Sequence, residues 1–314
     1  MFQTTLLLHV VFLSQVSTLC EGYLACDTYS ALMLGSSSSK ICAIDSHMYH
    51  DQDSVKKITN REIPFVNSKD LGTILKNGQH IKVGQGATGS LYLCQYRDKL
   101  CVIKYFTGPT ESFEKELEIG LALNGTGSVV PVYGQVYHDG QLLQAYVSRF
   151  IGNETSKMSR TFHTILKEWN EEKWSDGEVL SIVIQTAHKL KTIHEAGYFH
   201  GDVRSDNIMV DDHLEPCFSD LGQAAKHNDA YSYTINSEFK AYLEEFYDYI
   251  APELKQGGMF SKAADVYSFG HLLKVVSRQQ KREKLMSYSL KCLDKNPENR
   301  PGMHDVVSYL EGIM

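Results

Sequence analysis

The stretch that decides the fold is His200-Gly-Asp-Val-Arg-Ser-Asp-Asn-Ile-Met209, and Asp220-Leu-Gly222 begins thirteen residues after Asn207. Asp202 is a carboxylate that can orient a hydroxyl group and accept its proton. Asn207 and Asp220 carry the oxygen ligands that Mg²⁺ prefers. Together the three side chains can divide the work of moving a phosphoryl group. The alternative is a polar loop with local caps, which this ordered set of residues disfavours.

A second motif lies upstream, in Gly84-Gln-Gly86-Ala-Thr-Gly89-Ser-Leu91. Glycines let backbone amides approach phosphate oxygens. A strand-like stretch follows, whereas a dinucleotide site would need a helix there. Lys104 comes fifteen residues after Gly89, and Glu116 lies on the next predicted helix. An ammonium at Lys104 can neutralise phosphate charge, and Glu116 can fix its direction.

Hydrophobic patterning places these motifs on two kinds of structure. Residues 81–106 predict a β-hairpin that turns at Arg97 and Asp98, and residues 142–151 predict another strand. Residues 111–124 and 176–195 carry apolar side chains at helical spacing, and helices dominate after residue 153. The sequence therefore predicts an α+β chain, with a small β-rich N-lobe at about 78–151 and a larger helical C-lobe at about 152–314. The natural ligand site is the cleft between the lobes.

With these motifs in order, residues 78–314 resemble the eukaryotic protein kinase family, which implies a bilobal protein-kinase fold. Ala251-Pro-Glu253 resembles the end of an activation segment, and Asp265-Val-Tyr-Ser-Phe-Gly270 resembles the start of the central C-lobe helix. Arg300 matches the arginine that pairs with the family's Ala-Pro-Glu glutamate. The resemblance implies ATP with Mg²⁺ or Mn²⁺ as cofactors and a protein as substrate.

The same resemblance assigns roles to individual residues. The catalytic set is Asp202, Lys104, Glu116 and Arg204, and the metal ligands are Asn207 and Asp220. Leu91, Val102 and Met209 would enclose the adenine, and Ser148 to Ile151 would form the gatekeeper and hinge. The nucleotide-binding set is thus Gly84, Gly86, Gly89, Leu91, Val102, Lys104, Ser148, Phe150, Ile151 and Met209. Ordinary core packing is the alternative for the apolar members.

Three positions depart from the family pattern. Gly201 stands where many kinases carry an arginine that binds a phosphorylated activation segment, so activation by segment phosphorylation is not expected. Leu221 replaces a phenylalanine, and Gly120 replaces a bulky residue that braces the helix of Glu116. The segment between Asp220 and Glu253 also holds five tyrosines, for which packing is favoured over phosphorylation: Tyr231, Tyr233, Tyr242, Tyr247 and Tyr249.

The N-terminus predicts a signal peptide at residues 1–22, since Thr4 to Val16 is mostly apolar and too short to span a bilayer comfortably. Residues 23–77 form an N-terminal extension without a convincing period. We therefore expect a secretory or extracellular protein, with Asn124 and Asn153 in two N-glycosylation sequons. An uncleaved anchor or an ordinary buried segment would instead give a Golgi, cell-surface or cytosolic protein.

The cysteines fit an oxidising compartment, because six of the seven remain after such a leader. Cys94 and Cys101 fall opposite each other if Arg97 and Asp98 form a two-residue turn. Both then point away from the face that carries Lys104. We therefore expect a cross-strand disulfide between them, and two buried free thiols are the alternative.

Composition limits the remaining functions. The 314 residues are 42% hydrophobic, which suits a folded chain, and the net charge of −7 argues against nucleic acid as a partner. No stable transmembrane span is expected, and the sequence leaves the oligomeric state open. The function that fits best is an ATP-dependent protein kinase. The alternatives are a secreted pseudokinase that acts by binding and a phosphotransferase for a sugar or small metabolite; the Ala-Pro-Glu segment favours a polypeptide acceptor.

Overall fold

The computed structural model describes residues 49–50, 63–76, 78–86, 88–169, 171, 173–233 and 235–313. The predicted signal peptide lies outside the described residues. The described residues divide into two compact units: a strand unit from their N-terminal part to residue 114 together with residues 133–148, and a helical unit of the described residues in 115–132 and 149–313. The predicted combination of a small strand-rich part with a larger helical part is confirmed.

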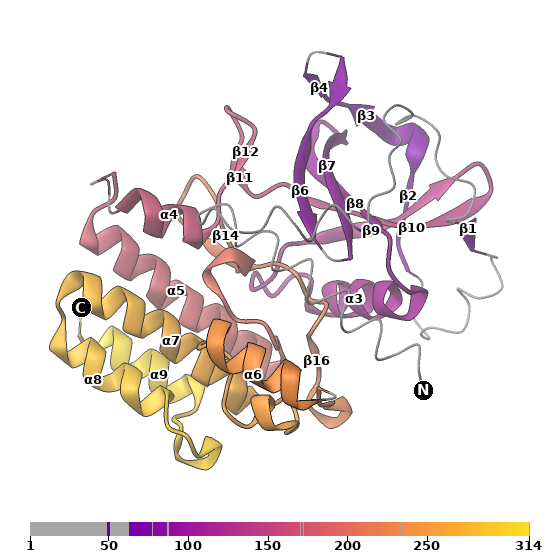
Figure 1. Ribbon diagram of the computed structural model, residues 1–314. Coiled ribbons are helices and arrows are strands. Elements are labelled where there is room, and N and C mark those ends of the chain that lie inside the picture. The colour runs from indigo at the N-terminus through magenta and orange to yellow at the C-terminus, as the bar shows by residue number, and fades with distance from the viewer. Residues whose placement is uncertain are drawn as a thin grey trace. The chain divides into compact units, whose positions relative to one another are not determined.

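An eight-stranded mixed sheet forms the strand unit (Figure 1). Its order is β2-β9-β10-β8-β7-β3, with β1 paired to β10 and β6 paired to β7. The strands are β1 (Tyr49–His50), β2 (Phe65–Asn67), β3 (Leu71–Thr73), β6 (Lys82–Gly86), β7 (Gly89–Tyr96), β8 (Lys99–Phe106), β9 (Val132–His138) and β10 (Gln141–Arg149). The predicted hairpin at 81–106 and strand at 142–151 correspond to β6 to β8 and to β10.

A short segment that we call the strap, residues 65–73, joins the two ends of this sheet order. Its first strand, β2, runs parallel to β9, and its last, β3, runs antiparallel to β7. The 3-10 turn η4 (Ser68–Asp70) connects them. Val66 is only 1% exposed and packs in one core with Ile103 and Val147. The strap thus covers backbone groups at both sheet edges that would otherwise lack strand partners.

The β7–β8 hairpin has the predicted register. Arg97 and Asp98 have positive φ angles of 48° and 61°, as a two-residue turn of the type that matches strand twist requires. Cys94 therefore lies opposite Cys101, and both are buried free thiols. Burial raises the pKa of Cys94 to about 12. The predicted cross-strand disulfide is therefore wrong, because the structure has two free thiols at these positions.

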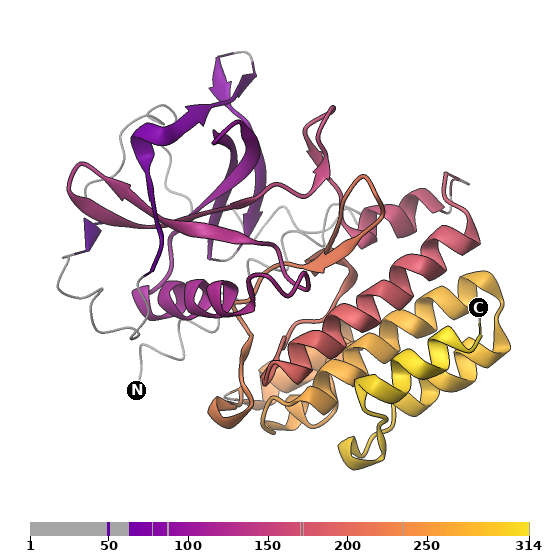
Figure 2. The same ribbon diagram turned by 180° about the vertical axis from the view of Figure 1, so that it is seen from behind.

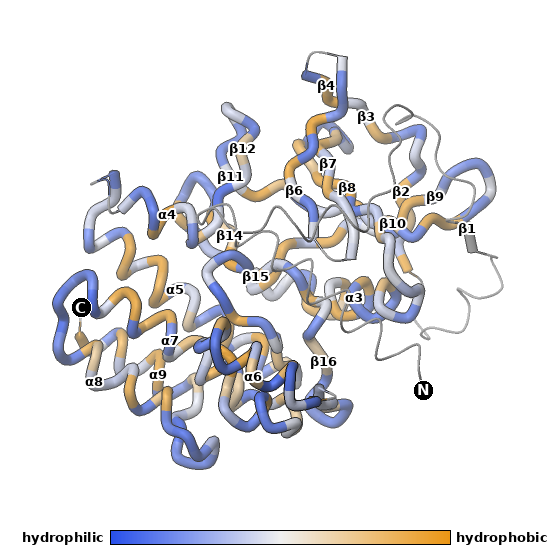
Figure 3. Tube along the Cα trace, in the orientation of Figure 1, coloured by the Kyte–Doolittle hydropathy of each residue, from blue (hydrophilic) through white to orange (hydrophobic). Residues whose placement is uncertain are grey.

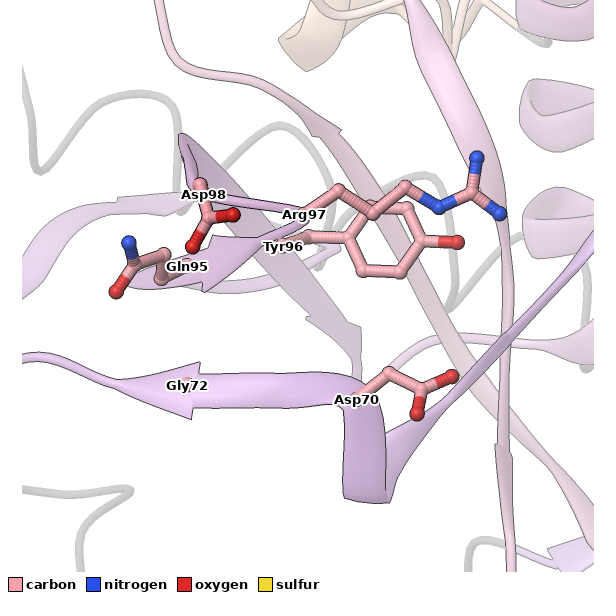
Figure 4. Close-up of a pocket in the computed structure, with 6 residues that line it drawn as sticks. All are labelled: Asp70, Gly72, Gln95, Tyr96, Arg97 and Asp98. Atoms are coloured by element: carbon pink, nitrogen blue, oxygen red, sulfur yellow. The ribbon is translucent and has the colours of Figure 1, made fainter.

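A shallow pocket lies at the turn end of this hairpin (Figure 4). It is lined by Asp70, Gly72, Gln95, Tyr96, Arg97 and Asp98. The Arg97 guanidinium lies 5.0 Å from the centre of the Tyr96 ring. Because β7 runs from Gly89 to Tyr96, this pocket and the glycine-rich motif are at opposite ends of the strand.

Helices dominate the second unit, and Figures 1 and 2 both show α5, α7, α8 and α9 side by side. The described residues form seven α-helices: α3 (Thr110–Leu123), which begins in the strand unit, α4 (Phe162–Trp169), α5 (Asp176–Glu195), α6 (Ser237–Phe246), α7 (Lys262–Gln280), α8 (Glu283–Cys292) and α9 (Met303–Glu311). None of the helices in the described part of the chain has the length and apolar character needed to cross a bilayer.

Helix α5 is the centre of the helical unit and has the predicted bounds. The Ser175 hydroxyl oxygen accepts a hydrogen bond from the Glu178 backbone N–H, and the Glu178 carboxylate accepts one from the Ser175 backbone N–H. These two bonds form a capping box at the helix N-terminus. Hydrophobic residues recur along the helix (Figure 3), and Val183, Ala187 and Leu190 are fully buried. This buried face organises the large core that α7 and α9 also line.

Short elements complete the fold, and two of them carry the predicted site residues Asn207 and Met209. The strand pairs are β4 (Leu75–Lys76) with β5 (Gln79–His80), β11 (Gly152–Asn153) with β12 (Met158–Ser159), β13 (Tyr198–Phe199) with β16 (Ala225–Lys226), and β14 (Ile208–Val210) with β15 (Pro216–Phe218). The 3-10 turns are η5 (Ser205–Asn207), η6 (His227–Asp229), η7 (Leu254–Gln256) and η8 (Pro297–Asn299).

The predicted contact between Arg300 and Glu253 is confirmed. Two guanidinium nitrogens of Arg300 donate to the two carboxylate oxygens of Glu253, at 2.6 and 2.7 Å. Arg300 Nη1 also donates to the carbonyl oxygen of Ala263. This paired geometry fixes the end of the 220–253 segment to the start of α7.

Candidate active site

The loop between β13 and β14 is held by the buried carboxylate of Asp265. Asp265, at the start of α7, accepts bonds from the backbone N–H groups of His200 (2.7 Å) and Gly201 (2.8 Å). His194 Nε2 lies 2.9 Å from the same carboxylate. Because two consecutive amides are held by one rigid helix, the backbone leading into Asp202 has a fixed direction.

Asp202 is a buried carboxylate with a defined orientation. The Asn207 side-chain amide donates to its carbonyl oxygen (3.0 Å) and to its Oδ2 (2.7 Å). Burial raises the pKa of Asp202 to about 6, although the positive charge of Arg204 acts in the opposite direction. The negative charge of Asp220 contributes to the rise, which indicates that the two carboxylates share one electrostatic environment. The group therefore takes up a proton more readily than an exposed aspartate.

The predicted metal ligands fit a hard cation. The nitrogen of the Asn207 amide is engaged with Asp202, which leaves Oδ1 as the ligand atom. The Asn207 carbonyl accepts from Ser219 N at 2.9 Å and thereby joins the two motifs. Asp220 has a φ of 56°, a left-handed conformation that is uncommon for non-glycine residues and that aspartate tolerates better than most. One carboxylate and one amide suit a cation that also binds phosphate oxygens.

The described residues contain no cluster of three or more His, Cys, Asp or Glu side chains able to hold a metal ion. A purely protein-bound metal centre therefore has no support in this part of the chain. The donor chemistry of Asn207 and Asp220 instead matches Mg²⁺, which usually binds through one or two carboxylates together with substrate phosphates.

Arg204 is held in place by its neighbours. Its Nε and Nη2 atoms donate to Asp206 Oδ2 at 3.2 and 2.9 Å, and its Nη1 atom donates to the Tyr249 hydroxyl at 3.4 Å. Both partners were missed in the sequence. The contact with Asp206 could have been predicted, because an acidic residue two positions from an arginine can form an ion pair with it. The contact with Tyr249 could not, because that residue lies 45 positions away in the sequence.

The glycine-rich motif divides into two kinds of position. A Cβ atom on Gly89 would lie 1.9 Å from the Tyr105 carbonyl oxygen, so close packing of β7 against β8 requires this glycine. A Cβ atom on Gly84 would meet only the Leu91 side chain, and one on Gly86 would meet nothing within 4 Å. The packing therefore explains Gly89, whereas the predicted phosphate role best suits Gly84 and Gly86.

Other predicted nucleotide residues of the strand unit lie on β7, β8 and β10. Leu91 pairs in register with Lys104, and Leu93 pairs with Val102. Lys104 is 7% exposed, with Nζ 4.4 Å from the centre of the Phe106 ring. Ser148, near the end of β10, is also 7% exposed. The alternation of β8 puts Val102 and Lys104 on one face, as predicted.

The remaining predicted residues belong to the helical unit. Phe150 and Ile151 are buried, directly after β10, and Met209 is half-buried on β14 opposite Cys217. Glu116, on α3, is 3% exposed, and its Oε2 lies 3.7 Å from where a Cβ on Gly222 would be. Since Lys104 and Glu116 fall in different units, their predicted ion pair stays a prediction.

The helix position that was expected to be loosely braced is closely packed. A Cβ atom on Gly120 would lie 2.9 Å from a methyl group of Val132 and 3.8 Å from Leu221 Cδ1. Val132 thus fills the space where the family usually has a larger residue on the helix. The Asn124 side chain fixes Val132 by bonds to its N–H (2.9 Å) and carbonyl (2.6 Å).

Comparisons with known proteins agree with this site. Residues 78–281 match the protein kinase domain family. The LRR receptor-like serine/threonine-protein kinase FEI 2 of Arabidopsis thaliana is 26% identical over 307 residues, covering 80% of this chain and 48% of that protein. The calcium/calmodulin-regulated receptor-like kinase 1 of Arabidopsis thaliana is 22% identical over 277 residues, covering 74% of this chain and 60% of that protein.

A third relative comes from a different organism. The stress-activated protein kinase alpha of Dictyostelium discoideum is 24% identical over 276 residues, covering 74% of this chain and 41% of that protein. This chain thus spans about half the length of the curated relatives it matches. The family match covers well over half of the chain and includes Lys104, Asp202, Asn207 and Asp220. On this evidence, the chain belongs to the protein kinase family.

Proposed function

We propose that the chain is an ATP-dependent protein kinase that transfers the γ-phosphate to protein hydroxyl groups with Mg²⁺ or Mn²⁺. The observation that carries this proposal is the buried Asp202 carboxylate, held at Oδ2 by Asn207 and backed by amides fixed to Asp265. A polar loop without a catalytic role has no need of a buried carboxylate whose pKa is raised to about 6.

Asp202 is the proposed catalytic base. The bond from Asn207 engages Oδ2, so Oδ1 is the oxygen that orients an acceptor hydroxyl and receives its proton. Asn207 Oδ1 and the Asp220 carboxylate hold the divalent cation, which when bound neutralises phosphate charge. Arg204 is set by Asp206 and Tyr249, and we assign it to the phosphate as it is transferred.

The strand unit supplies the proposed nucleotide contacts. Backbone amides around Gly84 and Gly86 approach the phosphates, where no side chain obstructs them. We assign Lys104 to the phosphate charge. Leu91, Val102 and Ser148 of the strand unit are assigned to the adenine, as are Phe150, Ile151 and Met209 of the helical unit. We assign the kinase domain to residues 78–314, behind an extension of residues 23–77 whose strap also joins the sheet.

Serine or threonine is the proposed acceptor in a protein substrate. Support comes from relatives named serine/threonine-protein kinases, such as FEI 2. Support for a polypeptide acceptor comes from the Ala251-Pro-Glu253 segment, which is locked by Arg300. A tyrosine acceptor is the alternative that phosphoamino-acid analysis of the product separates.

The proposed location is the secretory pathway or the extracellular space. The apolar leader at Thr4 to Val16 and the sequon at Asn153 support this location. Asn153 lies half-buried at the end of β11 and Thr155 is exposed; Asn153 Nδ2 donates to Asp212 Oδ1 at 3.1 Å, so a glycan on Nδ2 would replace or displace this bond.

The decisive experiment is transfer of labelled γ-phosphate from ATP by the purified chain, with Mg²⁺ or Mn²⁺, beside the variant Asp202→Asn. We expect transfer to a serine-rich protein acceptor, reduced about 100-fold or more in the variant, with ATP affinity changed less than threefold. Binding of ATP without transfer by the wild-type chain would favour the pseudokinase. Full activity of the variant would refute Asp202 as the base.

A further inference from the structure

The 220–253 segment of this chain makes an unusually close backbone contact at Gly201. Gly201 has a φ of 80°, and a Cβ atom there would lie 2.6 Å from the Gln223 carbonyl oxygen. It would also lie 3.1 Å from Gln223 Cβ. No larger residue fits while Gln223 keeps this position. The absent side chain thus makes room for the segment to lie directly against the catalytic loop.

One hydroxyl group holds Gln223 at this contact. Tyr231 Oη lies 2.7 Å from the Gln223 carbonyl oxygen and 2.6 Å from its side-chain Oε1. The hydroxyl has a single proton, so it donates to one of these oxygens at a time. The same carbonyl that approaches Gly201 is therefore tied to a residue eight positions further along the segment.

An aromatic cluster fixes the Tyr231 ring. It stacks on Phe260 with ring centres 4.5 Å apart and an interplanar angle of 27°, and Phe260 in turn stacks on Phe199 of β13. Phe260 N donates to the Tyr231 carbonyl oxygen at 2.8 Å. Tyr233 meets the edge of Phe260 at 4.8 Å. Stacking of this kind restrains the ring that carries the hydroxyl.

Two lysines connect this part of the segment to helix α3 within the helical unit. Lys115 Nζ lies 4.5 Å from the centre of the Tyr231 ring, within the range of a cation–π contact. Lys226 Nζ lies 3.3 Å from Glu118 Oε1. Lys115 is the residue directly before Glu116 on α3, so the segment and the helix of the predicted catalytic glutamate restrain each other.

We propose that Tyr231 is a positioning residue that holds the 220–253 segment against Gly201, so that phosphoryl transfer does not depend on phosphorylation of that segment. Its hydroxyl and ring stand in for the arginine–phosphate contact that Gly201 cannot make. Within the described segment Tyr231 acts through Gln223, because both hydrogen-bond partners of its hydroxyl group are oxygens of Gln223 and neither is Asp202 or Asp220. This inference rests on the proposed kinase function.

The test compares Tyr231→Phe with Tyr242→Phe in the full chain. Tyr231→Phe keeps the ring stack and removes only the hydroxyl, whereas the Tyr242 hydroxyl lies 3.5 Å from Tyr247 in the same segment. We expect Tyr231→Phe to lower kcat about fivefold to tenfold with KM for ATP unchanged, as loss of one hydrogen bond implies. Tyr242→Phe and phosphatase treatment of the wild type should each change kcat less than twofold.

Hydrogen exchange separates this inference from the proposed function. In Tyr231→Phe, amides at 221–226 should exchange at least fivefold faster, while amides of α5 stay unchanged. A wild-type chain without any transfer would refute the kinase function, and the exchange data would still decide the role of Tyr231. The inference is overturned by unchanged exchange at 221–226, by wild-type kcat in Tyr231→Phe, or by loss of most activity after phosphatase treatment.

Discussion

Replacing the proposed base should make the folded chain more stable while it abolishes transfer. The pKa of Asp202 rises from 3.8 to about 6 because the carboxylate is buried. At about 1.4 kcal/mol per pKa unit, ionised Asp202 costs the folded state about 3 kcal/mol at neutral pH. Asp202→Asn keeps the shape and the acceptor for Asn207 but buries an amide group, at a cost of about 1 kcal/mol. The net gain is about 2 kcal/mol.

The assay is thermal unfolding of both proteins, without nucleotide and with a chelator, from pH 4.5 to 7.5. A gain of this size raises the midpoint by roughly 3–4 °C at pH 7.5. The folded-state pKa of Asp202 lies above its unfolded value, so the wild type has no penalty below about pH 4 and the full penalty above about pH 6. The advantage of the variant should therefore shrink as the pH falls.

A matched control variant should change the stability of the folded chain in the opposite direction. The pKa of Asp248 is lowered, mainly by its hydrogen bond with His271, so Asp248→Asn should slightly destabilise the chain at pH 7.5. The reasoning is refuted if Asp202→Asn leaves the midpoint unchanged or lowers it. It is also refuted if the difference between variant and wild type does not depend on pH.

Three further outcomes follow from the structure. Expression in cells with a secretory pathway should give a chain whose electrophoretic mobility shifts on enzymatic deglycosylation, and Asn153→Gln should abolish this shift. Asn124→Gln should instead lower the unfolding free energy by about 1–3 kcal/mol, because the Asn124 side chain holds the backbone of Val132 through two hydrogen bonds. Gly201→Ala should reduce kcat at least tenfold, because its Cβ would collide with a carbonyl oxygen at 2.6 Å; Gly197→Ala, with φ of 88° and open space around it, isolates the backbone strain and should retain most activity. Arg300→Met should lower the urea midpoint by an amount equivalent to about 3–5 kcal/mol, because it leaves a partly buried carboxylate without its partner; a change below 1 kcal/mol would contradict that value.

Local patterns predicted the parts of the fold that depend on local physics. The bounds of α5 followed from its apolar period, and the β7–β8 register followed from a two-residue turn. The spacing of Asp202, Asn207 and Asp220 predicted a shared site, and the bond between Asp202 and Asn207 agrees with it. These features need only neighbours in sequence or a known motif spacing.

Other features depend on distant partners that no short pattern reveals. The strap has strands of three residues, too short to show alternation, and its partner β9 lies far along the chain. Gly120 suggested a loosely braced helix because the sequence does not show that Val132 occupies the space beside it. The bond between Tyr231 and Gln223 depends on the stacking of Phe260, which comes from outside the segment.

The strap also has a consequence for folding during synthesis. Val66 pairs with Val136, so the ribosome must add 70 further residues before this strand meets its partner. At 5–20 residues per second, that delay is about 4–14 s. During it, Phe65 and Val66 are apolar residues beside an unpaired backbone, the kind of segment that chaperones bind. The nascent chain should therefore be most prone to aggregation before β9 emerges, and slower translation ahead of β9 should lower the yield of folded protein.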